Sequence, residues 1–366
     1  MKENELYLQE QIITYIGNKR KLLAYIEAEI KGIQKETGKK KLICADLFSG
    51  SGIVARMLKQ YSEHLIVNDL EEYSKIINQC YLSNMSDFDG TEYQKWLTYI
   101  QKALETPISG VITQNYAPKD EANITAEDRV FYTIRNAQYI DTVRTAINDI
   151  PENYRKYFLA PLLHEASVHA NTSGVFKGFY KDKNIKVGKF GGTAENCLGR
   201  IKADIEIKKP VLSNFECAVT VYQRDTNQLA KELPQMDVVY LDPPYNQHSY
   251  GANYFMLNTI LNNHIGHNIS KVSGIPDDWN RSDYNVKSKV GDAFKQLIAD
   301  LPAKYIITSY NSEGFLSKDS IMKILQEYGS VKTIAIEYNA FRGSRNLQNR
   351  DLYVDEYLFV LCKERK

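Results

Sequence analysis

A short apolar run, Val238 to Leu241, ends abruptly in the tetrapeptide Asp242-Pro243-Pro244-Tyr245. A run of this kind that stops at an acid and two prolines predicts a buried strand ending at the carboxyl edge of a sheet, where open α/β sheets bind their ligands. The two prolines fix φ and remove two backbone donors, so the turn is stiff and presents carbonyl groups. A carboxylate, a free carbonyl and an aromatic ring on one rigid turn suit a planar base that bears an exocyclic amine. The alternative is a purely structural turn.

The N-terminal part of the chain predicts the opening of a doubly wound α/β sheet. A helix is expected over residues 18–36, because apolar residues recur there at helical spacing. A short strand over 41–47 then leads into the turn Asp46-Leu47-Phe48-Ser49-Gly50-Ser51-Gly52. A helix from about residue 53 to 61, a strand over 64–68 and a helix over 73–80 follow. This order of elements is typical of a sheet that binds a ligand beside its first strand.

The turn at Gly50 and Gly52 permits a tight bend and a close approach of a ligand to the backbone. It lacks the third glycine and the lysine of phosphate-binding loops, which argues against a nucleoside triphosphate. Asp69 follows the second strand about 20 residues later, where an acid commonly holds ribose hydroxyls. Asp225 follows another strand-like run, Val219 to Tyr222. The alternative for both acids is a helix N-cap or a surface position at a strand end.

Residues 81–210 interrupt the alternation of strands and helices. Helices are expected there over 128–148 and 154–168, and loop with short strands over 171–189. Strands then resume at 217–222, 238–241 and 305–309, with helices at 253–263 and 320–327, and two final strands at 333–338 and 357–362 pair as an antiparallel hairpin. We therefore predict an α/β fold: a Rossmann-like sheet built from residues 1–80 and 211–366, and an inserted, mainly helical domain over 81–210.

The composition narrows the class of protein. The net charge is only +1, so a nucleic-acid surface would have to be local. Five scattered cysteines form no zinc or disulfide pattern, so no metal site is expected. A polar N-terminus and the absence of an apolar run of about 20 residues predict a cytosolic protein that is not in a membrane. Two basic segments could contact nucleic acid, through Lys177, Tyr180, Lys181 and Lys183 in the insertion and through Arg342 and Arg345 between the last two strands.

Four segments together resemble the Dam-like methyltransferases that modify adenine N6 in DNA. Asp242-Pro243-Pro244-Tyr245 resembles their catalytic motif IV, residues 46–52 their motif I, and Val67-Asn68-Asp69 the acidic end of their second strand. Tyr15-Ile16-Gly17-Asn18-Lys19-Arg20-Lys21 resembles their N-terminal motif X. The order X, I, II, insertion, IV is similar to the alpha arrangement, in which the target-recognition domain precedes the catalytic motif, and the chain is closer to the methylases of type II restriction systems.

The resemblance implies S-adenosylmethionine as the methyl donor and double-stranded DNA as the substrate, with a cognate restriction endonuclease that would act separately. It implies that Asp242 and the Pro243 carbonyl accept from the adenine amine while Tyr245 stacks on a base that has left the duplex. The cofactor contacts that it implies are Tyr15, Gly17, Asn18, Lys19, Asp46, Phe48, Ser49, Gly50, Ser51, Gly52, Asp69, Asp225 and Asp242. For Lys19 the alternative is a solvated lysine at a helix start.

Two competing functions share these features. One is an RNA adenine-N6 methyltransferase with the same catalytic core, although the sequence contains no recognisable RNA-binding module. The other is a non-catalytic protein of the same fold that only recognises DNA within a larger complex. The intact tetrapeptide and glycine turn argue against that reading, since a decayed copy need not keep both. The target DNA sequence cannot be read from an insertion that resembles nothing familiar.

Overall fold

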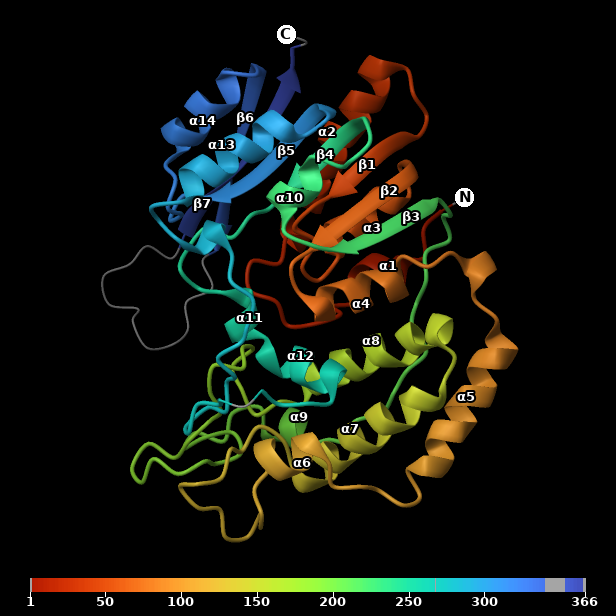
Figure 1. The fold of residues 1–366 in the computed structure, drawn as a ribbon, viewed down its shortest axis with the longest axis vertical. Coiled ribbons are helices and arrows are strands. Elements are labelled where there is room, and N and C mark those ends of the chain that lie inside the picture. Colours follow the sequence, from red (N-terminus) through yellow and green to blue (C-terminus); the bar gives the residue numbers. More distant parts are fainter. Residues whose placement is uncertain (1, 267, 340–352, 365–366) are drawn as a thin grey trace.

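A single mixed sheet organises the protein (Figure 1). The computed structural model describes residues 2–266, 268–339 and 353–364. Within these residues, seven strands pair in the order β3-β2-β1-β4-β5-β7-β6. Their bounds are β1 (Leu42–Asp46), β2 (Ser62–Asp69), β3 (Ala218–Gln223), β4 (Met236–Leu241), β5 (Ala303–Asn311), β6 (Gly329–Asn339) and β7 (Tyr353–Lys363). Only β7 is antiparallel to its neighbours, β5 and β6, which confirms the predicted Rossmann-like sheet and its closing hairpin.

Helices cover both faces of this sheet (Figure 1). One face packs against α2 (Leu23–Thr37) and α3 (Ile53–Lys59), and the other against α10 (Thr226–Ala230), α13 (Val290–Asp300) and α14 (Lys318–Gln326). The strands supply both cores because successive side chains point to opposite faces. In β1, Cys44 joins the core of the first face and Ala45 that of the second. The helices bury apolar residues at helical spacing, as Val290, Phe294 and Leu297 do in α13.

A helical layer lies beyond the edge where β1, β2 and β4 end. It contains α1 (Glu5–Gln9), α4 (Glu72–Tyr81), α5 (Gly90–Ala103), α6 (Val111–Tyr116), α7 (Ile134–Ala146), α8 (Glu152–Val168), α9 (Leu198–Lys202), α11 (Tyr250–Asn253) and α12 (Phe255–Asn262). The short 3₁₀ turns of the described chain are η1 (Arg20–Leu22), η2 (Met85–Asp87), η3 (Ile147–Asp149) and η4 (Asp283–Asn285). Residues of α5 to α8 share one apolar core with residues of α4 and α12. The inserted segment therefore packs directly on helices that flank it in sequence. No helix in the described ranges is long and apolar enough to cross a membrane.

The structure corrects one predicted helix and adds others. The helix expected over 128–148 begins only at Ile134, because Thr133 caps it by accepting from the Asn136 N–H. The residues just before it are not helical, and the N–H groups of Phe131 and Tyr132 both donate to the Tyr116 carbonyl. Helices α5 and α13 were not among the elements expected from sequence.

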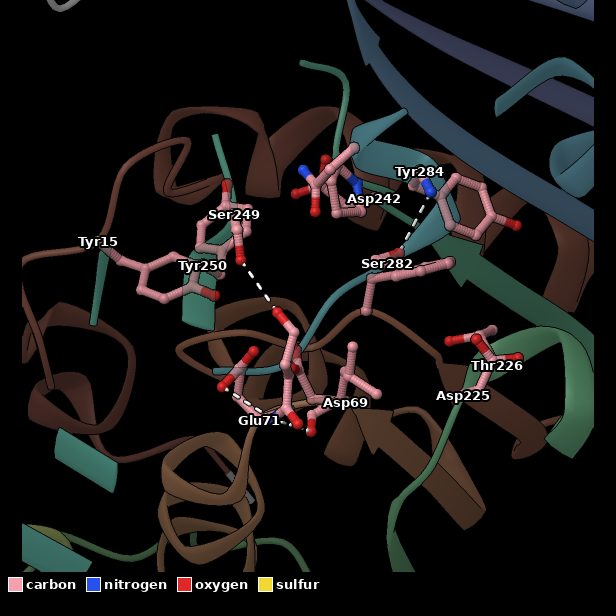
Figure 2. Close-up of a pocket in the computed structure, with 15 residues that line it drawn as sticks. Tyr15, Asp69, Glu71, Asp225, Thr226, Asp242, Ser249, Tyr250, Ser282 and Tyr284 are labelled. Atoms are coloured by element: carbon pink, nitrogen blue, oxygen red, sulfur yellow. Dashed lines mark hydrogen bonds between the residues drawn. The ribbon is translucent and has the colours of Figure 1, made fainter. Parts of the chain in front are cut away.

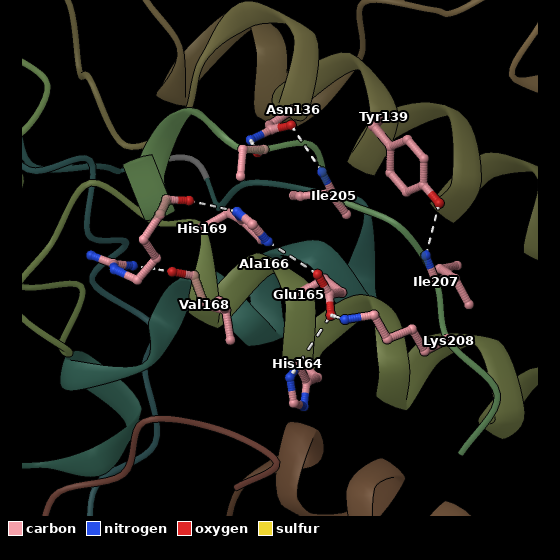
Figure 3. Close-up of polar contacts among 12 residues, drawn as sticks. Asn136, Tyr139, His164, Glu165, Ala166, Val168, His169, Ile205, Ile207 and Lys208 are labelled. Atoms are coloured by element: carbon pink, nitrogen blue, oxygen red, sulfur yellow. Dashed lines mark hydrogen bonds and ion pairs between the residues drawn. The ribbon is translucent and has the colours of Figure 1, made fainter. Parts of the chain in front are cut away.

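A polar network fixes the end of α8 to the segment that returns toward the sheet (Figure 3). His169 lies between the Arg200 carbonyl, 2.7 Å from its Nδ1, and the Glu165 carboxylate, 3.1 Å from its Nε2. Lys208 reaches the same carboxylate at 3.7 Å. Further along, the N–H groups of residues 205 and 207 donate to side chains of α7. These bonds satisfy the backbone of an otherwise irregular stretch, which supports a structural role for this cluster.

Candidate active site

A pocket opens at the carboxyl ends of β1, β2 and β4, at the point where the strand order reverses (Figure 2). Ligands of open α/β sheets bind at such a switch point. The pocket is lined by residues from the N-terminal segment, from the strand ends and from two segments that follow β4: Tyr15, Phe48, Asp69, Leu70, Glu71, Asp225, Thr226, Asp242, Pro244, Ser249, Tyr250, Asn280, Ser282, Tyr284 and Asn285. The tertiary structure thus brings the predicted N-terminal, glycine-turn and Asp242 segments to one place.

The glycine turn has the tight geometry that its sequence predicts. Gly50 and Gly52 have φ values of +50° and +75°, a region that side chains disfavour. A Cβ on Gly50 would lie 2.6 Å from Tyr15 Cε1, and one on Gly52 would lie 2.5 Å from Asn78 Oδ1. The turn therefore requires glycine twice, once for the approach of Tyr15 and once for that of α4. Phe48 and Ser49 belong to the same turn, and Phe48 packs edge-on against Tyr284 at 5.2 Å.

Asp46, at the end of β1, is a buried acid with an unused oxygen. Its Oδ1 has no hydrogen-bond partner among the described residues. Burial, together with the nearby carboxylates of Asp242 and Asp69, raises the pKa of Asp46 well above its ordinary value. An unpaired buried oxygen costs free energy unless a ligand satisfies it. Asp46 is thus suited to accept from a ligand group, above all a cationic one.

Asp69 and Asp225 both line the pocket and both also bind backbone. Asp69 accepts from the Gly50 N–H at 2.7 Å and from the Glu71 N–H at 2.9 Å. Asp225 caps α10 by accepting from the Gln228 N–H at 3.0 Å, so the N-cap alternative describes its protein contacts. Neither bond excludes a ligand contact, because each carboxylate has four lone-pair sites.

The N-terminal segment folds over the glycine turn through its aromatic ring. Tyr15 stacks against both Tyr250 and Tyr254, with each ring centroid 4.9 Å away, and its hydroxyl lies 3.3 Å from that of Tyr73. Gly17 follows with a φ of +76°. The Asn18 side chain accepts from the Arg20 N–H, which starts the turn into α2. This arrangement brings Lys19 inward.

Lys19 is buried, with 5 % of its surface exposed, so the reading of a solvated lysine is wrong. Its Nζ lies 3.0 Å from Asp242 Oδ1, which makes an ion pair with the predicted catalytic acid. Burial raises the pKa of Asp242 to about 6, and Lys19 opposes that rise.

Tyr245 packs edge-on against Tyr310 at 6.3 Å, and its carbonyl accepts from the Phe315 N–H. The turn is thus held on both sides of its two prolines.

Several residues at this edge carried no sequence signal. Asn280 donates to the Leu70 carbonyl and to Glu71 Oε2, both at 3.2 Å, and its own carbonyl accepts from Ser249 Oγ. Asn285 donates to the Asn246 carbonyl at 2.8 Å. The segment that follows α12 therefore closes one side of the pocket. Such contacts join residues far apart in the chain, and only the aromatic and polar character of 279–285 could have suggested them.

The predicted nucleic-acid residues of the insertion lie in an irregular loop beside the pocket. Lys177 is exposed and its Nζ is 3.3 Å from His248 Nδ1, just beyond the turn formed by residues 242–245. Lys181 lies over the Phe179 ring, Lys183 is exposed, and Tyr180 is half-buried. Phe176 and Phe179 are buried core residues. Arg342 and Arg345 lie outside the described residues. In the part of the chain that the structure describes, no cluster of three or more His, Cys, Asp or Glu could hold a metal ion.

The strand order and the pocket at its switch point define a Rossmann-like α/β protein that binds a ligand at this edge of the sheet. Residues 15–324 match the family model of the D12 class N6 adenine-specific DNA methyltransferases, and the chain belongs to this family. It is 33 % identical over 362 residues to the type II methyltransferase M.NlaIII of Neisseria lactamica, covering 96 % of this chain and 99 % of that protein. It is 31 % identical over 369 residues to M.CviAII of Paramecium bursaria Chlorella virus 1, covering 96 % and 99 %. The predicted activity, adenine-N6 methylation of DNA, is confirmed.

More distant comparisons show lower similarity. M.FokI of Planomicrobium okeanokoites is 28 % identical over 96 % of this chain, which covers 52 % of that longer protein. Among solved structures, the Synechocystis magnesium protoporphyrin IX methyltransferase with bound SAM aligns with a TM-score of 0.34 at 10 % identity, covering 94 % of this chain and 84 % of that one. The family membership therefore rests on sequence.

The methyl donor of this family is S-adenosylmethionine, and the residues present fit it. The unsatisfied Oδ1 of Asp46 offers an acceptor to a cationic amino group. Asp69, Asp225 and Phe48 line the pocket, where hydroxyl groups and an aromatic base can bind, whereas Asp46 is buried and is not among the lining residues. The glycine turn keeps the backbone open to the close approach of a ligand. The cofactor supplies an electrophilic methyl group on a sulfonium.

Proposed function

We propose that this enzyme methylates one adenine within a specific double-stranded DNA sequence, and that Asp242, Pro243, Pro244 and Tyr245 form its catalytic turn. The observation that carries the proposal is the position of Asp242. Its carboxylate ends β4, lines the cofactor pocket, and is paired through Oδ1 with Lys19. The pairing leaves Oδ2 as the acceptor for an adenine amine.

Adenine N6 is a poor nucleophile because its lone pair is delocalised into the ring. Hydrogen bonds from the amine to the Asp242 carboxylate and to the Pro243 carbonyl favour tetrahedral geometry at nitrogen, so that the lone pair can attack. Most of the rate enhancement then comes from positioning and electrostatic stabilisation. No strong base is required, since the nitrogen loses its proton only after it has gained the methyl group.

The base must leave the duplex to reach this pocket, because its N6 edge is otherwise paired. Tyr245 is the ring beside Asp242 on which an extruded adenine would stack. The lysines of the insertion, Lys177, Lys181 and Lys183, are proposed to contact phosphates next to the target. The other residues proposed to bind the cofactor are Tyr15, which lines the pocket, and Gly17, Asn18, Ser49 and Ser51, which are not among its lining residues.

The biological setting is proposed from the relatives. M.NlaIII and M.CviAII are both described as type II methyltransferases, and this chain matches them over nearly their full length. We therefore propose that it protects DNA in a restriction-modification pair, with a cognate endonuclease acting separately on the same sequence. The compartment would be the cytoplasm, where such a substrate and S-adenosylmethionine are both present.

The test is transfer of tritium from labelled S-adenosylmethionine to unmethylated duplex DNA and to RNA, with wild type and Asp242→Ala compared. We expect the wild type to place label in DNA as N6-methyladenine. In the variant the rate of labelling should fall by at least ~10³-fold, because the turn supplies most of the positioning and electrostatic effect. Wild-type rates in Asp242→Ala would refute the catalytic assignment. Mapping the modified adenines then yields the target sequence, and protection of that sequence from digestion tests the restriction setting.

A further inference from the structure

A buried carboxylate outside the four motif-like segments lies behind the catalytic turn. Glu356, on β7, has 4 % of its surface exposed. Its Oε1 lies 3.1 Å from Lys19 Nζ and accepts from Ser309 Oγ at 2.8 Å. Its Oε2 accepts from Asn311 Nδ2 at 3.1 Å. Two side chains of β5 therefore fix both oxygens of Glu356, and the antiparallel pairing of Asn311 with Glu356 sets the register of that clamp.

The Lys19 ammonium is held from three directions. It donates to Asp242 Oδ1 and Glu356 Oε1, and also to the Gly17 carbonyl at 3.1 Å. An ammonium has three donors, so these contacts use them all. Its location is consequently set by the N-terminal segment, by the end of β4 and by β7. A buried ion cluster of this kind is costly to assemble, and loss of one member leaves the others uncompensated.

We propose that Glu356 is a positioning residue for methyl transfer: it holds the Lys19 ammonium against Oδ1 of Asp242, so that Oδ2 is left to face the adenine amine. Glu356 does not line the pocket, so it positions Asp242 through Lys19, while its charge also acts on the pKa of Asp242. The inference rests on the proposed catalytic role of Asp242.

The charges around Asp242 give this role a measurable signature. Lys19 lowers the pKa of Asp242, whereas Glu356 raises it, as does burial, which brings the pKa to about 6. The other titratable groups that face Asp242 are Asp46 and the hydroxyls of Tyr240, Tyr245 and Tyr250. Burial raises the pKa of each of these four groups and favours their neutral forms. Removing Lys19 and removing the charge of Glu356 should therefore shift the titration of Asp242 in opposite directions.

The experiment follows kcat/KM on unmethylated duplex DNA from pH 5 to pH 8, because this parameter reports the ionisation of the free enzyme. In Lys19→Met the acid limb should move to higher pH. In Glu356→Gln the amide oxygen can still accept from Lys19 and Ser309, but the negative charge is gone, so the limb should move to lower pH. Asp355→Asn is the matched control, because this exposed neighbour on β7 should leave the limb where it is.

A second readout separates positioning from folding. At pH 8, Glu356→Ala should lower kcat 10- to 100-fold with an unchanged KM for S-adenosylmethionine, and Glu356→Gln should restore most of that loss. If Glu356→Ala does not fold, the position of the acid limb in the kcat/KM profile of Glu356→Gln still tests the proposal. A limb that stays at the wild-type pH in Glu356→Gln, or that moves with that of Lys19→Met, overturns the inference. Full activity of Asp242→Asn at pH 8 would instead refute the proposed role of Asp242 itself.

Discussion

The carboxylate of Asp69 accepts a hydrogen bond from the backbone N–H of Gly50 at 2.7 Å, which ties the end of β2 to the glycine turn after β1. The same carboxylate accepts from the Glu71 N–H and also lines the pocket. One acid thus shapes the turn and faces the cofactor site. Its loss should affect cofactor binding twice, through the turn and through the direct contact.

Asp69→Asn should weaken S-adenosylmethionine binding, because an amide can accept only one of these two bonds well and places a donor against the other N–H. Loss of a bond to a charged group costs about 1.5–3 kcal/mol, which corresponds to a Kd raised roughly 10- to 150-fold. Calorimetric titration measures the Kd. Asp237→Asn is the control: Asp237 accepts from the Ile43 N–H at the opposite end of the sheet, so only stability should fall. Equal losses of affinity in both variants would contradict the prediction.

Gly50→Ala should disrupt the cofactor site. The new Cβ would meet Tyr15 Cε1 at 2.6 Å and would sit at a φ of +50°, which costs about 1–3 kcal/mol in strain alone. We expect a Kd for S-adenosylmethionine at least tenfold higher and a lower melting temperature. Gly32 lies inside α2, and no atom lies within 4 Å of a Cβ added there. Gly32→Ala should therefore raise the free energy of unfolding by roughly 0.5–1 kcal/mol. A Gly50→Ala enzyme with normal affinity would show that Tyr15 moves without consequence.

Glu71→Gln should stabilise the protein at alkaline pH. Burial, followed by the negative charge of Asp69, raises the pKa of Glu71 to about 7, while Asn258 and Asn280 donate to its carboxylate. Because the folded pKa lies above the ordinary value of 4.5, ionisation of Glu71 opposes folding, and this cost grows between pH 4.5 and 7 and is complete above pH 7. The size of this pKa shift limits the loss of folding free energy on ionisation of Glu71 to about 3 kcal/mol.

Thermal unfolding of wild type and Glu71→Gln from pH 5 to pH 8 checks this sign. The variant should melt higher at pH 8, and the difference should shrink toward pH 5. Glu72→Gln provides a comparison on the next residue, where removal of an acid from the first turn of α4 should lower stability rather than raise it. If the difference in melting temperature between Glu71→Gln and wild type does not change with pH, the raised pKa of Glu71 is not its cause.

Replacement of Lys177, Lys181 and Lys183 by alanine should weaken binding to all duplex sequences alike. Each lost phosphate contact removes about 0.9 from the slope of log K against log salt, so the slope should fall by up to ~3. Fluorescence anisotropy at several salt concentrations measures both quantities. A triple replacement of Lys31, Lys35 and Lys40, exposed on or just after α2, changes the net charge equally and should leave the slope unchanged. An unaltered slope in the first variant would remove these lysines from the DNA surface.

The sequence by itself determined the parts of this protein that depend on short stretches of chain. An apolar run that stops at Asp242-Pro243 predicts the end of a buried strand, and Gly50 and Gly52 predict a tight turn, so the sheet edge beside the pocket was predictable. The closing hairpin followed from two strand-like runs near the C-terminus. Helix boundaries in the insertion were less predictable, because Thr133 and the bonds to the Tyr116 carbonyl override the local pattern.

Only the tertiary structure decided which distant side chains meet. Lys19 is isolated in sequence from both of its carboxylate partners, and nothing near Glu356 distinguishes it from an acid on a surface strand. The folded chain buries these three charged side chains together, and a buried charge requires a partner. Lys19 pairs with both carboxylates, and the β5–β7 register places Ser309 and Asn311 where they donate to Glu356. Asn280 likewise closes the pocket across a long stretch of chain. Local pattern sets strands and turns, whereas the electrostatics of the site depend on contacts that exist only in the folded chain.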